Sequence, residues 1–143
     1  MVVEEKHQDL FALDYESEYC LCHCVSEDLA MGKGIAVLFR DKFGGIENLR
    51  SQCKAVGETA AIPSGGMRIY YLITKPKYWN KPTYETLERS LSCTKNDMIQ
   101  RGYTKLGMPK IGCGLDGLEW PRVRAMIDRL FSASGIDVIV CVK

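Results

Sequence analysis

The feature that most limits the fold of this chain is an alternation of apolar, strand-like runs with segments whose apolar residues recur at helical spacing. This alternation is typical of an α/β domain, in which helices cover a parallel or mixed sheet. Strands are predicted over residues 2–5, 19–25, 59–62, 68–74, 105–108 and 136–142. A length of 143 residues suits one domain with a proper core. We therefore expect a single unit, residues 1–143, built on a six-stranded sheet.

Helices are predicted over residues 34–43, 46–55, 84–101 and 120–132, each followed shortly by a glycine. Glycine commonly ends a helix because it adopts the left-handed conformation without a steric penalty. Thr83 is a suitable N-cap for the third helix, and Pro121 fits the first turn of the fourth, where an N–H has no helical partner. The apolar stripes of these two helices are expected to pack on the sheet as core.

Charge and cysteine content argue against several classes of function. The 19 basic and 18 acidic residues nearly cancel, so the chain has no broad field for holding a nucleic-acid backbone, and any anion must be bound locally. The seven cysteines are odd in number, several lie in apolar runs, and no signal-peptide pattern precedes them. These features favour a reduced, intracellular protein over a disulfide framework. No apolar run reaches the length of a membrane span.

Two loops that contain glycines lead into helices: SEDLAMGKGIA, residues 26–36, and GCGLDGLEW, residues 112–120. Ligands of open α/β sheets bind at the carboxyl ends of strands, and the N–H groups at helix N-termini attract phosphate. Two such loops facing each other would suit a diphosphate. Neither has the Walker A spacing, which argues against a nucleoside triphosphatase. Either loop alone could also be an ordinary tight connection.

Two residues could carry chemistry beside these loops. Lys75 ends an apolar strand and precedes Pro76, so its amine should project at the sheet edge where ligands gather. A partly desolvated lysine can attack a carbonyl or anomeric carbon, although spacing alone favours an exposed, solubilising lysine. Asp116 stands among Gly112, Gly114 and Gly117, whose lack of a Cβ lets backbone amides approach a ligand closely.

The run CLCHCV, residues 20–25, contains residue types that bind metals, but a strand would not bring them together. On a strand, Cys20, Cys22 and Cys24 share one face while His23 points the other way. Zinc sites normally combine one C-x₂₋₄-C pair with a second pair elsewhere, and no second pair is present, so buried cysteines and no metal are expected. A Cys–His hydrolase built on Cys113 and His23 is an alternative on residue type alone.

Taken together, these loops and the lysine resemble those of a macrodomain, specifically of the terminal ADP-ribose protein glycohydrolase branch. The resemblance runs from about His7 to the C-terminus. It is carried by DLFA (9–12), HCVSEDLAMGKGIAVLF (23–39), KFGG (42–45), YYLITK (70–75), KPTYE (81–85) and MPKIGCGLDGLEW (108–120). Most macrodomains have an asparagine-rich segment where this sequence has Ser26, as this branch does. The chain departs from the family pattern in Lys33, between two loop glycines, and in its end VIVCVK, which lacks an aromatic residue.

The resemblance implies a three-layer α/β/α fold with a central mixed six-stranded sheet and a site for ADP-ribose. Lys75 would be the nucleophile and Asp116 its acid/base partner. Asp9 would accept a hydrogen bond from the adenine amine, Leu10 would offer backbone nearby, and Ser26 would contact the distal ribose. The diphosphate would be held by the backbone of Gly32, Gly34, Ile35 and Ala36 in the first loop, and of Gly112, Cys113, Gly114 and Leu115 in the second.

The implied activity is release of ADP-ribose from glutamate- or aspartate-linked ADP-ribosylated proteins, without a metal or cofactor. Deacylation of O-acyl-ADP-ribose would be a second activity of the same pocket. The alternative is a non-catalytic ADP-ribose reader, in which Lys75 has a structural or electrostatic role. We expect a monomer in the nucleus or cytoplasm, without membrane contact, for which nucleic acid matters only as ADP-ribosylated ends.

Overall fold

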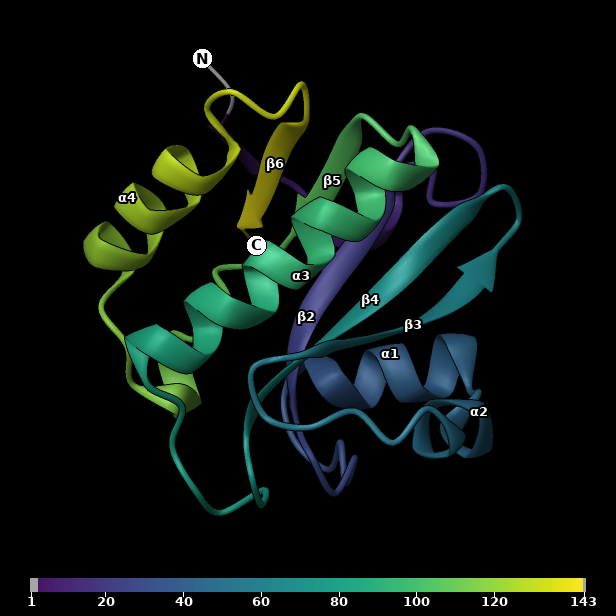
Figure 1. Cartoon of the computed structure of the whole chain (residues 1–143), viewed down its shortest axis with the longest axis vertical. Coiled ribbons are helices and arrows are strands. Elements are labelled where there is room, and N and C mark those ends of the chain that lie inside the picture. Colours follow the sequence, from purple (N-terminus) through teal and green to yellow (C-terminus); the bar gives the residue numbers. More distant parts are fainter. Residues whose placement is uncertain (1–2, 143) are drawn as a thin grey trace.

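A computed structural model describes residues 3–142, which form one mixed sheet of six strands in the order β1-β6-β5-β2-β4-β3 (Figure 1). The four pairings among β1, β6, β5, β2 and β4 are parallel, and β3 pairs antiparallel with β4 at one edge. The strands are β1 Val3–His7, β2 Cys20–Ser26, β3 Thr59–Ser64, β4 Met67–Lys75, β5 Lys105–Met108 and β6 Asp137–Val142. The predicted mixed six-stranded sheet is thereby confirmed. Val2, the predicted start of the first strand, lies outside the described residues.

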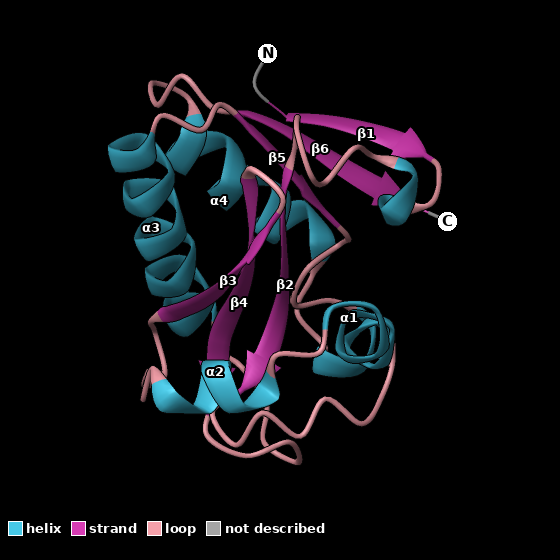
Figure 2. Cartoon of the chain, turned by 90° about the vertical axis from the view of Figure 1, so that its right-hand side faces the viewer, coloured by secondary structure: helices cyan, strands magenta, loops and turns pink. Residues whose placement is uncertain are grey.

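Helices cover both faces of this sheet. One face carries α3 Tyr84–Arg101 and α4 Trp120–Phe131, and the other carries α1 Ile35–Phe43 and α2 Ile46–Ser51. Figure 2 shows α3 and α4 on one side of the strands and α1 on the other. The two apolar layers meet the sheet separately, because alternate residues of each strand point to opposite faces. The predicted three-layer α/β/α arrangement is confirmed. Within the described chain, no helix combines the length and the apolar character needed to cross a bilayer.

The third and fourth helices begin as their capping residues predict. The Thr83 hydroxyl accepts a hydrogen bond from the backbone N–H of Thr86, and the Thr86 hydroxyl accepts one from the backbone N–H of Thr83. Gly102 ends α3 in the left-handed conformation, with φ of 80°. Pro121 lies in the first turn of α4. These ends depend on neighbouring residues only, which is why the sequence predicts them.

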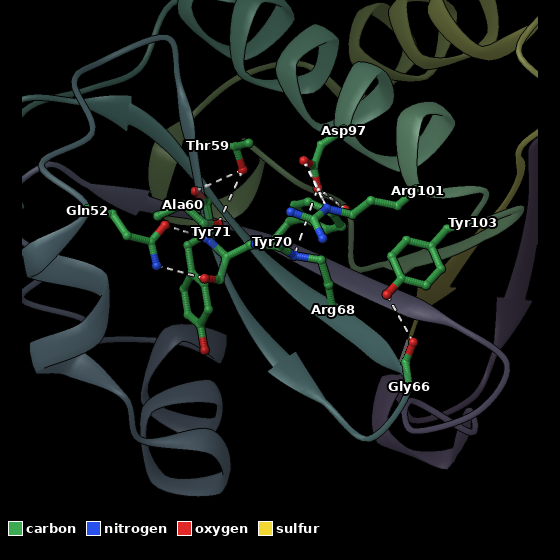
Figure 3. Close-up of polar contacts among 11 residues, drawn as sticks. Gln52, Thr59, Ala60, Gly66, Arg68, Tyr70, Tyr71, Asp97, Arg101 and Tyr103 are labelled. Atoms are coloured by element: carbon green, nitrogen blue, oxygen red, sulfur yellow. Dashed lines mark hydrogen bonds and ion pairs between the residues drawn. The ribbon is translucent and has the colours of Figure 1, made fainter.

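The second helix is shorter than predicted: it ends at Ser51 instead of continuing to residue 55. The Gln52 side chain leaves the helix to bind the backbone of Ala61 on β3, donating to its carbonyl at 2.7 Å and accepting from its N–H at 3.1 Å (Figure 3). Cys53 then turns the chain away with φ of 51°. A tertiary contact with the edge strand therefore replaces the last helical turn. The short 3₁₀ turns η1 Leu10–Ala12 and η2 Gly114–Asp116 were also not predicted.

The sheet order determines where a site can form. Because five strands run parallel, their carboxyl ends lie along one edge of the sheet, at His7, Val142, Met108, Ser26 and Lys75. The loops that follow β2, β4 and β5 therefore emerge next to one another. These are the loops that contain both glycine segments and the residues after Lys75.

A polar cluster joins α3 to the first half of β4, which lies away from the carboxyl end of the strand (Figure 3). The Asp97 carboxylate accepts a hydrogen bond of 2.6 Å from the Tyr70 hydroxyl and others from Arg101 at 3.1 and 3.2 Å. Arg68 Nε lies 3.8 Å from the same carboxylate. Burial would raise the pKa of Asp97, but the hydrogen bonds from Tyr70 and Arg101 and the charge of Arg68 hold it below its ordinary value. The ionised carboxylate thus links strand and helix.

Replacing Asp97 by Ala should lower the free energy of unfolding by about 2–4 kcal/mol at neutral pH, because Tyr70 loses its partly buried acceptor and Arg68 loses its ion-pair partner. Urea unfolding measures this change. Asp41→Ala is the control: Asp41 pairs only with its exposed neighbour Arg40, so a change below about 0.5 kcal/mol is expected. A lowered carboxyl pKa contributes stability above the ordinary value that disappears as the pH falls through the lowered one. The Asp97→Ala deficit should therefore shrink in acid, and an equal deficit at pH 7 and pH 3 would contradict this account.

Candidate active site

A cavity of about 710 Å³ opens at the carboxyl ends of β2, β4 and β5. Its walls come from the end of β2 (24–26), the first glycine loop (30–36), the loop after β4 (78–81) and the second glycine loop (109–113, 115 and 116). Lys75 completes the lining. The volume lies within the range of about 300–1,000 Å³ that is usual for small-molecule sites. The cavity therefore forms where the sheet order brings the loops together.

Lys75 and Asp116 meet inside this cavity. Lys75 is the last residue of β4, Asp116 is the last residue of η2, and Lys75 Nζ donates a hydrogen bond to Asp116 Oδ1 at 2.7 Å. Their side chains are 15% and 17% exposed, so the pair is shielded from bulk water yet open to the cavity. They are 41 residues apart in the sequence. The structure thus brings the predicted amine and the predicted acid into direct contact.

The turn that holds Asp116 depends on a glycine. Gly112 has φ of 73°, and a Cβ at this position would lie 2.9 Å from Leu118 and 3.2 Å from Leu87. The Leu118 N–H donates to the Gly112 carbonyl at 2.8 Å and closes the loop around η2. Only a residue without a side chain fits both the conformation and this space. The backbone of this loop therefore lies close to the cavity while Asp116 points to Lys75.

The first glycine loop ends at the N-terminus of α1. Gly34 is the N-cap, and the N–H groups that follow at Ile35 and Ala36 have no helical acceptor. The Leu115 side chain from the second loop lies within 3.9 Å of the Cβ position of Gly34, and Lys81 donates a hydrogen bond to the Leu115 carbonyl. The two loops therefore approach each other across the cavity. Backbone N–H groups and a helix dipole at this place favour an anion.

Ser26 reaches the same cavity at an irregularity in the pairing of β2 with β4, where Thr74 of β4 has no partner in the register. The strand register shifts between Val25 and Ser26, so Ser26 pairs with Lys75. Bulges of this kind re-aim a side chain at the end of a strand. Ser26 is only 4% exposed, and its neighbour Glu27 donates its backbone N–H to the Lys75 carbonyl at 2.8 Å. The serine and the lysine are thereby placed side by side.

The cavity is positively charged although the chain is nearly neutral. Of the charged side chains in the described chain that line it, four are lysines (Lys33, Lys75, Lys81 and Lys110) and one is the carboxylate of Asp116. The whole chain has a formal net charge of only +1. Positive charge is therefore concentrated where the two loops meet. Lys33, the unusual residue between the loop glycines, adds to this local field instead of closing the cavity.

Three predicted site residues, Asp9, Leu10 and Gly114, are not part of this lining. Asp9 follows β1, so it lies at the same sheet edge but is separated from β2 by β6 and β5. Its carboxylate accepts a hydrogen bond from the N–H of Phe11 at 3.0 Å and caps η1. Leu10 is buried in the core beside α1. The structure thus places Asp9 and Leu10 outside the cavity, along the edge to which it opens.

The Cys–His alternative is not compatible with the structure. His23 stacks on Phe39 of α1 at 3.8 Å, whereas Cys113 packs against the apolar layer on the other face of the sheet. Burial lowers the pKa of His23 to about 3, which removes it as a general base, and burial raises the pKa of the Cys113 thiol, which disfavours the reactive thiolate. Cys20 and Cys22 lie on the face opposite His23, as predicted. Within residues 3–142, no group of three or more His, Cys, Asp or Glu residues could hold a metal ion.

The loop after Lys75 was missed as part of the site. Tyr78 and Trp79 are exposed, lie edge to face with ring centres 4.9 Å apart, and line the cavity together with Asn80 and Lys81. Two aromatic residues in a loop of charged and polar residues are the signal that the sequence offered. A second unrecognised feature is strain beside Ala30, where Leu29 and Met31 have φ of 55° and 44°. Strained residues of this kind tend to cluster at functional sites.

The fold and the cavity define an α/β ligand-binding domain with a paired lysine and aspartate at the strand ends. The family model of the Macro domain matches residues 22–127. The chain therefore belongs to the macrodomain family, which confirms the resemblance seen in the sequence.

Similar proteins support this assignment. Over 132 aligned residues the chain is 50% identical to ADP-ribose glycohydrolase OARD1 of Homo sapiens. The alignment covers 92% of this chain and 86% of that protein. The macrodomain of Thermus aquaticus DarG superposes with a TM-score of 0.87 at 22% identity, covering 99% of this chain and 98% of that one. Thermosipho africanus DarTG in complex with ADP-ribose superposes with a TM-score of 0.82 at 20% identity, over 99% of this chain and 41% of that one. At these identities the two structures show the shared fold.

The two glycines of the second loop should respond differently to alanine. Gly112→Ala introduces both a left-handed alanine and an overlap with Leu118 and Leu87, whereas Gly114 has φ of 68° and open space around its Cβ position. The left-handed conformation alone costs about 1–2 kcal/mol, and overpacking adds about 1 kcal/mol or more. Urea unfolding should therefore show a larger loss of stability for Gly112→Ala than for Gly114→Ala. Equal losses would mean that the space around Gly112 does not matter.

The buried His23 should make the protein less stable in mild acid. The folded protein keeps the ring neutral because burial lowers its pKa from 6.5 to about 3, while the unfolded chain takes up a proton below pH 6.5. Stability is therefore lost as the pH falls from 6.5 toward 3, by about 2–3 kcal/mol at pH 4.5. His23→Phe keeps the stacking on Phe39 and should remove this part of the pH dependence in urea titrations. Parallel stability curves for both proteins would contradict the assignment.

Proposed function

We propose that this protein is a hydrolase that removes ADP-ribose from glutamate- or aspartate-linked ADP-ribosylated proteins. The observation that carries the proposal is the Lys75–Asp116 contact of 2.7 Å inside a positively charged cavity between two glycine loops. The identity of 50% to ADP-ribose glycohydrolase OARD1 supports the removal of ADP-ribose as the reaction.

The diphosphate of ADP-ribose would bind between the two loops. The backbone amides of residues 32–36 and 112–115 would hold the phosphate oxygens, with the N-terminus of α1 adding its dipole. Ser26 would then contact the distal ribose beside Lys75. The adenine would extend along the sheet edge toward Asp9 and Leu10. From β4 to β1 this edge covers four strand spacings, about 19 Å, which an extended ligand with two sugars and a diphosphate can bridge.

In the first step, Lys75 Nζ attacks the anomeric carbon of the distal ribose. A bond forms between nitrogen and carbon, the bond from that carbon to the substrate carboxylate oxygen breaks, and the glutamate or aspartate side chain leaves as a carboxylate. An ammonium group cannot attack, so the lysine must first pass a proton to Asp116, for which their hydrogen bond offers a direct path. Covalent catalysis of this kind divides one difficult displacement into two easier ones.

In the second step, water replaces the lysine. After the substrate carboxylate has left, Asp116 passes the proton that it took from Lys75 to solvent water and is again ionised. It then accepts a proton from the attacking water, the bond between carbon and Lys75 Nζ breaks, and Asp116 gives this proton to the freed amine as ADP-ribose is released. The same carboxylate thus acts as a base in both steps and returns its proton to the lysine, a contribution of about 10²–10⁴-fold. No metal or cofactor takes part in this scheme.

The decisive experiment uses a protein substrate that carries ADP-ribose on glutamate. Lys75→Ala and Asp116→Ala should each reduce the rate of ADP-ribose release by about 10³-fold or more, because each removes a group that reacts directly. Both variants should still bind ADP-ribose in a calorimetric titration, since the backbone amides remain. Lys105→Ala, a surface lysine paired with Glu18, is the control and should keep full activity.

Each outcome bears on a specific part of the proposal. Unchanged turnover in Lys75→Ala would rule out the lysine as nucleophile. Binding of ADP-ribose by the wild-type protein without release from any linkage would identify a reader. Release from O-acyl-ADP-ribose alone would assign the same pocket to a deacylase.

A further inference from the structure

The carboxylate of Asp28, in the loop between β2 and α1, joins three parts of the active site. Its Oδ1 accepts hydrogen bonds from the Ser26 hydroxyl and from the backbone N–H of Ala30, the latter at 3.2 Å. Its Oδ2 accepts the backbone N–H of Tyr78 at 3.2 Å, from a residue 50 positions away in the sequence. Ser26, Ala30 and Tyr78 all line the cavity, whereas Asp28 does not. The carboxylate therefore supports the cavity wall from behind.

We propose that Asp28 is a positioning residue of the active site, which fixes the Ser26 hydroxyl toward the distal ribose and holds the loop that follows Lys75. This inference rests on the proposed function, because it assigns Ser26 to the ribose. It concerns a residue that touches no reacting atom.

The first part of the role follows from the chemistry of a hydroxyl group. A serine hydroxyl has one hydrogen to donate and two lone pairs that accept. In Ser26 the hydrogen is donated to Asp28, so the oxygen can offer only its lone pairs to a ligand. With 4% exposure, Ser26 has little room to turn away. Asp28 thereby makes Ser26 an acceptor for a ribose hydroxyl, beside the lysine with which Ser26 is paired in the sheet.

The second part concerns the chain that leaves β4. Residues 77–80 form a turn, in which the Lys77 N–H donates to Asn80 Oδ1 at 2.9 Å and the Asn80 N–H donates to the Lys77 carbonyl at 3.0 Å. The Tyr78 N–H in this turn is bound by Asp28, and the Lys75 carbonyl is bound by the N–H of Glu27. The segment after Lys75 is thus fastened twice to residues 27 and 28. Its motion would otherwise move the wall that contains Tyr78.

Only a carboxylate can satisfy all three donors. Burial would raise the pKa of Asp28, but hydrogen bonds from Ser26, Tyr78 and Ala30 and the charge of Lys77 hold it below its ordinary value, so the group is ionised at neutral pH. Both oxygens then accept. An asparagine has one accepting oxygen, and its NH₂ group would face either the Tyr78 N–H or the N–H of Ala30. Asp28→Asn therefore keeps the size of the side chain but leaves one of these backbone N–H groups without its acceptor.

The test is a double-mutant cycle on Asp28 and Ser26, measured as kcat/KM for ADP-ribose release. Asp28→Ala should reduce kcat/KM by about 10–100-fold, because small displacements of reacting groups have effects of this size. If the two residues acted independently, the fold-loss in kcat/KM of the double variant Ser26→Ala/Asp28→Ala would equal the product of the two single fold-losses. We expect it to be smaller than that product by a factor of at least about five, since Asp28 acts partly through Ser26. A residue that only stabilised the fold would give independent losses.

Two further variants keep the result interpretable. Asp28→Asn should fold even where Asp28→Ala does not, and should still lose about tenfold in kcat/KM through the unpaired N–H group. Glu47→Ala is the control: its exposed carboxylate makes no hydrogen bond or ion pair with the residues described, so kcat/KM should stay within twofold. Thermal unfolding of each variant establishes that the proteins compared are folded.

Failure of this inference can be told apart from failure of the proposed function. If the wild-type protein binds ADP-ribose but releases none, the same cycle is measured on the Kd for ADP-ribose, where the two substitutions should again be coupled. Wild-type values in Asp28→Ala and Asp28→Asn, or losses that multiply in the double variant, would overturn the positioning role. Coupling in either measurement supports it.

Discussion

The contact between Lys75 and Asp116 is the interaction on which the rest of the site depends. It requires β4 to end beside β2, and the turn after β5 to double back over that end. The parallel sheet supplies the first condition and the conformation of Gly112 the second. Because both side chains are mostly shielded from water, their mutual position is set by the surrounding backbone and not by solvent. Chemistry at this point is therefore a consequence of how two loops close.

Binding and chemistry are divided between backbone and side chains. Backbone N–H groups and the N-terminus of α1 suit a diphosphate, and the lysines around the cavity concentrate positive charge in a chain of net charge +1. Such a field attracts an anionic ligand to one place without making the whole surface basic. In the proposed complex, the side chains of Ser26, Lys75 and Asp116 would contact the ribose next to this diphosphate. Asp28 would extend this division, because it contacts Ser26, Ala30 and Tyr78 and does not itself line the cavity.

The stabilising polar cluster and the strained backbone beside the cavity lie in different parts of the fold. The cluster around Asp97 ties the first half of β4 to α3, away from the strand end that lines the cavity. Strained backbone instead occurs at Leu29 and Met31, in the loop that Asp28 supports. The stability supplied by the rest of the fold allows the strained backbone beside the cavity to persist. The buried His23 packs against the rings of Phe39 and Tyr71.

Local patterns in the sequence were sufficient for the strands, for the start of α3 at Thr83 and its end at Gly102, and for placing Lys75 at a strand end. Periodicity and capping depend on residues a few positions apart, which is why they can be read directly. The end of α2 and the wall at Tyr78 depend instead on contacts of Gln52 with β3 and of Asp28 with the chain 50 residues later. The sequence alone determined the layers and the candidate residues. Only the tertiary structure decided which of them meet, because the strand order and the closure of the loops govern distances between segments far apart in the chain.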